Sequence, residues 1–171
     1  MDSLKEKIRS VPDFPKAGIT FFDITTLLRD RDGFNATIDA IAKPFAGDAI
    51  DIVVGVESRG FILGGAVADR LNAGFAPVRK KGKLPSHAIR ETYDLEYGTD
   101  CLEIHSDAVE RGQRVLIVDD VLATGGTAAA TAALVRKLGG EIRALAFLIE
   151  LEFLNPRTKL GSETIFSVLK Y

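Results

Sequence analysis

The chain has little of what disulfides and metal centres require. Among its 171 residues there is one cysteine, Cys101, and there are two histidines. A single thiol excludes an intramolecular disulfide, a zinc knuckle and an iron–sulfur cluster. His87 and His105 are too few for a histidine-rich metal site, and we assign a role to neither. We therefore expect a chain of the reducing cytoplasm that is stabilised by its core alone.

An excess of one charge and long hydrophobic runs are also absent. The 22 Lys and Arg residues nearly balance 24 Asp and Glu, which gives a net charge of −2 and a pI of ≈ 5.7. Because nucleic-acid-binding proteins carry a basic excess, we expect no nucleic-acid partner. Residues 1–10 are charged, unlike a signal peptide, and no apolar run approaches the ~20 residues of a membrane span. We expect neither secretion nor membrane insertion.

The composition that remains is that of one globular domain. Hydrophobic residues make up 46% of the chain and charged residues 27%, which is too apolar for a disordered protein. A compact chain of this length buries roughly 70% of the surface that its unfolded form exposes. We expect a single domain over residues 1–171, without a linker or an internal repeat.

Strand-like and helix-like segments alternate along most of the chain. Ser3–Glu6 fits a capping box for a short first helix with Leu4 and Ile8 on one face, and Asp30 or Asp32 can cap a second. The expected strands are 19–22 (or an extended lip), 50–56, 75–78, 114–118, 142–149 and 164–169, and the expected later helices are 34–45, 61–71 and 127–138. Apolar strands joined through helices predict an α/β fold, with a mostly parallel sheet covered on both faces.

The pattern changes between residues 80 and 105. Polar and apolar residues alternate there, with Gly98 near the middle, which predicts an antiparallel excursion. We expect this segment to form a flap that rises from the sheet.

The most informative stretch is Val115–Thr127. An apolar strand is expected to end at the carboxylates Asp119 and Asp120, and a loop of small residues then runs into a helix. Ligands of parallel sheets bind beyond the carboxyl ends of the strands, where this loop is expected. Glycines let the backbone approach an anion, and the helix start offers free N–H groups. The residues predicted to bind phosphate are Ala123, Thr124, Gly125, Gly126 and Thr127.

The acid pair distinguishes this loop from other phosphate-binding motifs. The sequence has neither GxxxxGK[ST] nor a GxGxxG after a strand. Two adjacent carboxylates suit the cis-diol hydroxyls of a ribose, with a divalent cation nearby. The prediction is a site for ribose 5-phosphate, and the structural alternative is an acidic turn before a capped helix.

This stretch closely resembles the phosphoribosyl-pyrophosphate signature of the type I phosphoribosyltransferases. The resemblance covers nearly the whole chain and narrows to the branch of that family that acts on adenine. The segments that carry it are 11–15, 18–24, 55–61, 78–85 and 95–98. It implies a mostly parallel twisted sheet flanked by helices with an antiparallel flap or hood, a base-binding segment within residues 1–30 and a flap over about 80–105.

The resemblance also implies an activity. Such an enzyme, a glycosyltransferase of purine salvage, moves the 5-phosphoribosyl group from phosphoribosyl pyrophosphate to adenine and forms AMP and pyrophosphate. It implies a homodimer, and Mg²⁺ held mainly by pyrophosphate and ribose, with Asp119 and Asp120 nearby. The alternatives are a transferase for another purine base, a phosphoribosyl-pyrophosphate-sensing regulator, and a structural α/β protein with a relic site.

Pyrophosphate is expected at the turn over residues 57–60 and at the base of the flap. The turn offers helix N–H groups and the Arg59 guanidinium to an anion, or else it holds a solvated arginine. Four cations surround Gly82 and can form an electrostatic clamp or a solvated basic loop, and one of them can act across a dimer interface. The family pattern assigns to pyrophosphate Glu57, Ser58, Arg59, Gly60, Arg79, Lys80 and Lys83.

Catalysis is assigned to Arg59 and to Glu96 and Tyr97 of the flap. A carboxyl group near the purine can exchange a proton with a ring nitrogen. The resemblance implies this acid/base role for Glu96 and closure over the site for Tyr97. The alternative is a pair of exposed flap residues.

The residues expected to bind adenine have the weakest sequence signal of the three parts of the site. The resemblance implies that Phe21 stacks on the purine while backbone groups around Thr20 and Phe22 bind its edge, and Leu122 is expected to form the opposite wall. Phe22 stands where many relatives carry an arginine, so recognition there is expected from the main chain. For one of the two phenylalanines, ordinary core packing is the alternative.

Overall fold

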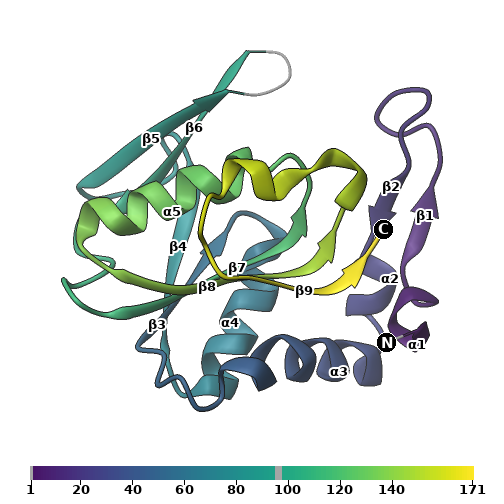
Figure 1. Ribbon diagram of the computed structural model, residues 1–171, viewed down its shortest axis with the longest axis horizontal. Coiled ribbons are helices and arrows are strands. Elements are labelled where there is room, and N and C mark those ends of the chain that lie inside the picture. Colours follow the sequence, from purple (N-terminus) through teal and green to yellow (C-terminus); the bar gives the residue numbers. More distant parts are fainter. Residues whose placement is uncertain (1, 95–97) are drawn as a thin grey trace.

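The computed structural model describes residues 2–94 and 98–171. Its described residues form a sheet of seven strands in the order β5-β6-β4-β3-β7-β8-β9 (Figure 1). Five neighbouring strands run parallel, which confirms the predicted α/β fold. These strands are β4 (Gly74–Lys80), β3 (Ile52–Val56), β7 (Arg114–Leu122), β8 (Glu141–Glu150) and β9 (Ile165–Lys170).

Helices cover both faces of this sheet. Along β7, Leu116 and Val118 face the core under α3 and α4, whereas Ile117 faces the core under α5. Each strand residue therefore has a covered side, which explains why the strands are apolar throughout. Figure 1 shows α3 and α4 on one side of the sheet and α5 on the other. The helices are α3 (Arg31–Ala42), which continues into η1 (Lys43–Phe45), α4 (Arg59–Leu71) and α5 (Gly126–Leu138).

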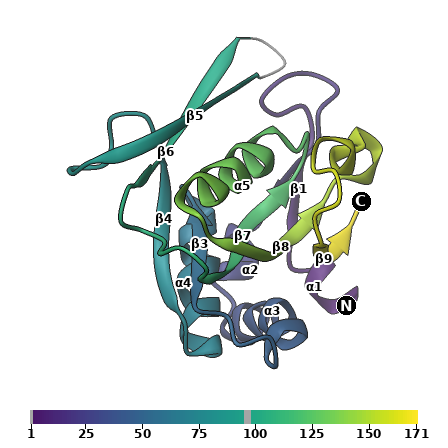
Figure 2. The same cartoon turned by 60° about the vertical axis from the view of Figure 1, so that its left-hand side comes forward.

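The flap is an antiparallel hairpin, as predicted. It consists of β5 (Ala88–Asp94) and β6 (Thr99–His105), which pair along their whole length, and β6 pairs with the end of β4. The hairpin rises above the sheet on the side that α5 covers (Figures 1 and 2). An ion pair of 2.5 Å between Lys137 of α5 and Glu91 of β5 ties it to that helix.

The N-terminal segment forms a second, smaller hairpin beside the sheet. Its helix ends at Lys5, so that Ile8 lies beyond it, although Leu4 and Ile8 are both buried. The Asp30 side chain accepts a 2.7 Å hydrogen bond from the Gly33 amide and is therefore the cap of α3. The elements are α1 (Asp2–Lys5), β1 (Arg9–Val11), β2 (Phe21–Asp23), which pairs antiparallel with β1, and α2 (Thr25–Leu28).

β7 is longer than the sequence predicts. The acid pair was expected to follow the strand, but β7 continues to Leu122 because β8 pairs with it as far as Glu150. After β8 the chain forms two short 3₁₀ turns, η2 (Glu152–Leu154) and η3 (Pro156–Lys159). Among the described residues, no helix has the length and apolarity that crossing a membrane requires.

Candidate active site

The acid pair lies inside β7, near its carboxyl end. Asp120 is 7% exposed, and its carboxylate accepts a hydrogen bond from Arg59 Nε at the start of α4. Side chains alternate along a strand, and Asp119 lines a cavity of about 80 Å³ beneath the loop 123–125. The two carboxylates therefore lie on opposite faces of β7.

The Asp119 carboxyl is held in an unfavourable environment for a charge. Burial, and then the neighbouring charge of Asp120, raise the pKa of Asp119 well above its ordinary value. Hydroxyl donors or a cation would stabilise the ionised form and lower the pKa again. The site is thus suited to a ligand that brings such groups.

Gly60 allows α4 to begin directly beside this carboxyl. A Cβ atom at Gly60 would lie 2.7 Å from Asp119 Oδ1 and 3.2 Å from the Val118 carbonyl oxygen. The first distance is shorter than Cβ atoms tolerate and the second is tight, so a larger residue would have to displace the Asp119 carboxylate, and glycine allows the close approach of the helix start to β7.

Arg59 joins three distant segments of the chain. It is the first residue of α4, its guanidinium pairs with Asp120 of β7, and it stands 5.3 Å from the ring centroid of Phe21 in β2. Ser58 precedes the helix, and its side chain makes no capping bond to the described residues. Because the Phe61 amide already donates to the Ser58 carbonyl oxygen at 3.2 Å, the Arg59 and Gly60 amides are the ones at the start of α4 that can bind an anion.

Glu57 organises the base of the flap. Its carboxylate accepts hydrogen bonds from Arg79 Nε at 3.1 Å, the Lys80 amide at 2.9 Å and Lys83 Nζ at 2.7 Å. Burial alone would raise the pKa of Glu57, but the bonds from Lys83, Lys80 and Arg79 outweigh it and lower the pKa below its ordinary value. Since a carboxylate repels pyrophosphate, we interpret Glu57 as the residue that gathers the cations rather than as a ligand of the anion.

The cations assigned to pyrophosphate therefore come together beside the 57–60 turn. Lys80 Nζ pairs with Asp100 of β6 at 3.2 Å, and Arg79 donates to the Lys83 carbonyl oxygen at 3.2 Å. Their positions on β4 and directly after it follow from the parallel pairing of β4 with β3.

The phosphate loop packs against the segment that follows β8. Gly125 has a φ of +82°, and a Cβ atom there would lie 2.5 Å from the Pro156 carbonyl oxygen. Glycine is therefore required twice, for its conformation and for this contact. On the other side of the loop, Thr127 Oγ1 lies within hydrogen-bond distance, 3.2 Å, of the Tyr93 hydroxyl of the flap.

A groove of about 510 Å³ lies between β2 and the segment after β8. Thr20 and Phe22 line it, as expected of base-binding residues, whereas Phe21 stacks edge-on against Phe14 with ring centroids 5.4 Å apart. Phe22 also stacks on Tyr171, with a centroid separation of 4.0 Å. The full lining is Gly18, Ile19, Thr20, Phe22, Thr124, Leu151, Phe153 and Leu154.

The wall opposite β2 differs from the prediction. Leu122 was expected there, but it is 1% exposed and belongs to the core under α5. The wall comes instead from Leu151, Phe153 and Leu154, which sequence reasoning missed. Their signal was available: they directly follow a strand whose carboxyl end lies at the same edge of the sheet as the acid pair.

Two further predictions concern groups that the structure does not test. Glu96 and Tyr97 lie outside the described residues. No group of three or more His, Cys, Asp or Glu side chains suited to a metal ion occurs in the described ranges. The Asp119 and Asp120 carboxylates, with the oxygens of a bound substrate, nevertheless form a donor set that suits Mg²⁺, which favours a few carboxylates and substrate phosphates over an all-protein cage.

The fold and this site define a phosphoribosyltransferase. Residues 25–163 match the phosphoribosyl transferase domain, and the chain belongs to this family.

Within the family the chain groups with the adenine phosphoribosyltransferases. It is 60% identical to the adenine phosphoribosyltransferase of Acidobacterium capsulatum, over 99% of this chain and 94% of the relative. The crystal structure of the Thermoanaerobacter pseudethanolicus enzyme has a TM-score of 0.97, 52% identity and 99% coverage of both chains. The Saccharomyces cerevisiae enzyme, crystallised with adenine and an imino-altritol bisphosphate, has a TM-score of 0.93 and 42% identity, covering 98% of this chain and 97% of that one.

Proposed function

We infer that the protein transfers the 5-phosphoribosyl group from phosphoribosyl pyrophosphate to adenine, forming AMP and pyrophosphate. One observation carries this inference. An apolar groove with room for a purine, the acid pair Asp119 and Asp120, and a glycine-containing phosphate loop adjoin one another at the carboxyl ends of the strands. The relatives named adenine phosphoribosyltransferase share this chain over nearly its whole length.

The substrates are assigned to the three parts of the site. The 5-phosphate binds the loop from Ala123 to Thr127, where the helix N–H groups and threonine hydroxyls are donors. The ribose hydroxyls bind Asp119 and Asp120. Pyrophosphate binds the turn over residues 58–60 with the cations Arg79, Lys80 and Lys83, and adenine enters the groove between Thr20 and Leu154.

The reaction breaks the bond between the anomeric carbon and pyrophosphate and forms a bond from that carbon to a ring nitrogen of adenine. Positive charge develops on the ribose, and the buried acid pair stabilises it. Arg59 and the flap cations stabilise the negative charge on the departing pyrophosphate. We assign to Glu96 the proton exchange with the purine ring and to Tyr97 closure of the flap, which excludes water from the activated sugar.

Mg²⁺ is the cofactor we propose, since a pyrophosphate substrate beside one or two carboxylates is the donor set that this ion favours. Asp119 and Asp120 would hold it together with oxygens of the substrate. When bound, it would neutralise part of the charge on the pyrophosphate group.

We further propose that the protein is a cytoplasmic homodimer. Exposed apolar side chains support self-association, because Ile62 of α4 and Phe75 of β4 are 47% and 37% exposed. Light scattering coupled to size-exclusion chromatography tests this, and a mass near the 18.5 kDa of one chain would contradict it.

One assay tests the activity. The protein is incubated with phosphoribosyl pyrophosphate and Mg²⁺, each purine base is offered separately, and the nucleotide is identified. We expect AMP from adenine. A nucleotide formed from guanine but not from adenine would overturn the assignment.

A further inference from the structure

The residues from Leu151 to Lys159, here called the cover segment, are fixed at both ends. At one end, the Leu151 amide donates to the Leu122 carbonyl oxygen at 3.0 Å, and the Glu152 amide donates to the Tyr171 carbonyl oxygen at 2.9 Å. At the other end, the Arg157 side chain reaches back to the last residue of β8. The segment is thereby closed into a compact loop.

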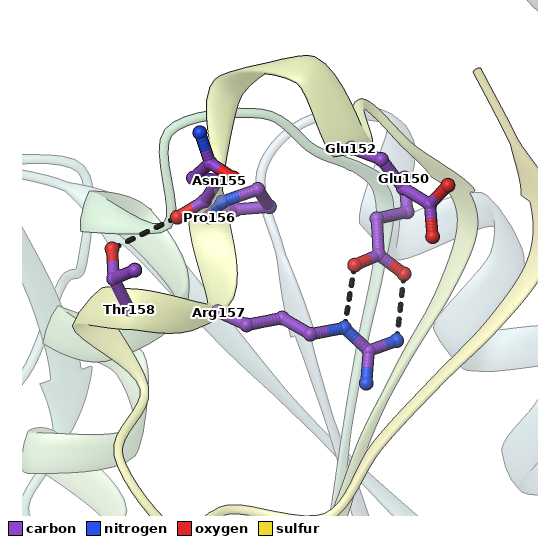
Figure 3. Close-up of a pocket in the computed structure, with 6 residues that line it drawn as sticks. All are labelled: Glu150, Glu152, Asn155, Pro156, Arg157 and Thr158. Atoms are coloured by element: carbon purple, nitrogen blue, oxygen red, sulfur yellow. Dashed lines mark hydrogen bonds and ion pairs between the residues drawn. The ribbon is translucent and has the colours of Figure 1, made fainter.

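The closing contact is a two-pronged ion pair. Arg157 Nε and Nη2 donate to the two oxygens of Glu150, at 2.6 and 2.8 Å (Figure 3). Glu150 is only 1% exposed. A fork of this kind fixes orientation as well as distance, because both N–H groups must face both carboxylate oxygens.

The cover segment contacts two parts of the candidate site at once. On one side, Leu151, Phe153 and Leu154 form the apolar wall of the groove assigned to adenine. Phe153 is 66% exposed, so core packing does little to fix it. On the other side, the Pro156 carbonyl oxygen lies against Gly125 of the phosphate loop. A shift of this segment would move both surfaces together.

We propose that Arg157, through its fork on Glu150, is a positioning residue that sets the adenine wall and the phosphate loop relative to each other. This inference rests on the proposed function, since it concerns how the two substrates of that reaction are held. Arg157 contacts neither substrate in it. Arg157 acts by restricting the cover segment. Its loss should therefore weaken the binding of both substrates rather than of one.

The experiment compares Arg157→Met with a matched control. Arg157→Met keeps the aliphatic stem and removes the fork. Arg114→Met removes a second two-bond ion pair, which lies at the amino ends of the parallel strands. There Arg114 Nε and Nη2 donate to the two carboxylate oxygens of Asp51 at 2.9 and 2.8 Å. KM for adenine, KM for phosphoribosyl pyrophosphate and kcat are measured below the Tm of every variant.

For Arg157→Met we expect KM for both substrates to rise about tenfold, with a smaller fall in kcat. Arg114→Met should leave both KM values within about twofold of wild type. Leu154→Ala, which alters the wall alone, should raise KM for adenine only. Arg157→Lys keeps the charge without the fork and should fall between wild type and Arg157→Met; it decides the question if the methionine variant does not fold.

Three results would overturn the proposal: unchanged KM values in the Arg157 variants, a rise for one substrate only, or an equal rise in Arg114→Met. Failure of the proposed function is a separate outcome, because then the wild-type protein would form no AMP.

Discussion

Two carboxylates at opposite ends of the parallel strands, Asp51 and Asp119, are held in opposite ways. At the amino edge, Asp51 accepts two bonds from the Arg114 side chain and one, at 2.8 Å, from its amide, and these bonds lower the pKa of Asp51 to about 2. At the carboxyl edge, burial raises the pKa of Asp119. One carboxylate is satisfied by the protein itself, and the other is best satisfied by a ligand. The first arrangement serves folding, and the second serves binding and catalysis.

The most severe test of this contrast is the double variant Asp119→Asn, Asp120→Asn. Removing both charges at the carboxyl edge should lower kcat/KM by about 10³-fold or more, because the ribose loses its electrostatic partners. Tm should change little, since the loss of the Asp120–Arg59 ion pair is offset by removal of the unfavourably placed Asp119 charge. Steady-state kinetics and thermal unfolding measure the two effects. Near-normal turnover would sink the assignment of this edge to catalysis.

A glycine at each edge gives the next comparison. Gly125 and Gly112 have nearly the same backbone angle, with φ values of +82° and +83°. Gly125→Ala adds a Cβ atom 2.5 Å from the Pro156 carbonyl oxygen, whereas the Cβ atom of Gly112→Ala would meet no other atom within 4 Å. Both should lose roughly 1 kcal/mol of stability from the left-handed conformation. Only Gly125→Ala should also raise KM for phosphoribosyl pyrophosphate, by roughly 10²-fold, since its loop must move. Equal kinetics for the two variants would contradict this.

Arg59→Gln tests how much a cation contributes at the carboxyl ends of the strands, in comparison with the acid pair. The variant leaves the Asp120 carboxylate without its guanidinium and removes one donor to the pyrophosphate. We expect kcat/KM to fall by about 10- to 100-fold, less than in the acid-pair variant, because the flap cations remain. We expect kcat to fall and KM for phosphoribosyl pyrophosphate to rise, and no change in either would contradict the catalytic role.

The smallest effect on activity is expected at the amino edge. Arg114→Gln should lower Tm and leave kcat/KM within about twofold of wild type. Because the pKa of Asp51 in the folded protein lies at about 2, below its ordinary value of 3.8, the ion pair stabilises the fold fully above about pH 4. The stability difference between wild type and variant should therefore shrink as pH falls from 4 towards 2. Chemical denaturation across that range measures it, and a difference independent of pH would refute the interpretation.

Local patterns in the sequence predicted most of the fold. The apolar runs located β3, β4, β7, β8 and β9, and the alternating segment located the flap, because each pattern depends on near neighbours in the chain. Element ends were harder to predict. β7 extends past Asp120 only because β8 pairs with it there, and that pairing is not encoded in the residues of β7 alone.

Of the residues assigned to the candidate site from the sequence, the structure brings the charged ones together more fully than the apolar ones. Asp119, Asp120 and the phosphate loop stand together in the sequence and lie together in the structure. Glu57 was assigned to the anion, since its sequence position does not reveal that three donors converge on it. Leu122 was misplaced because strand alternation turns it into the core, and the wall residues near Phe153 belong to a segment without a recognised motif.

Glu57 has a consequence for how the enzyme meets its substrate in solution. Arg79 and Lys83 share Glu57, and Lys80 pairs with Asp100, so two carboxylates offset two of these three positive charges before a polyanion arrives. The attraction that phosphoribosyl pyrophosphate feels from a distance is therefore weaker than the run of basic residues suggests. The second-order rate of substrate capture should vary little with ionic strength, and recognition should act at contact range, where pyrophosphate oxygens replace the carboxylates as partners of the cations.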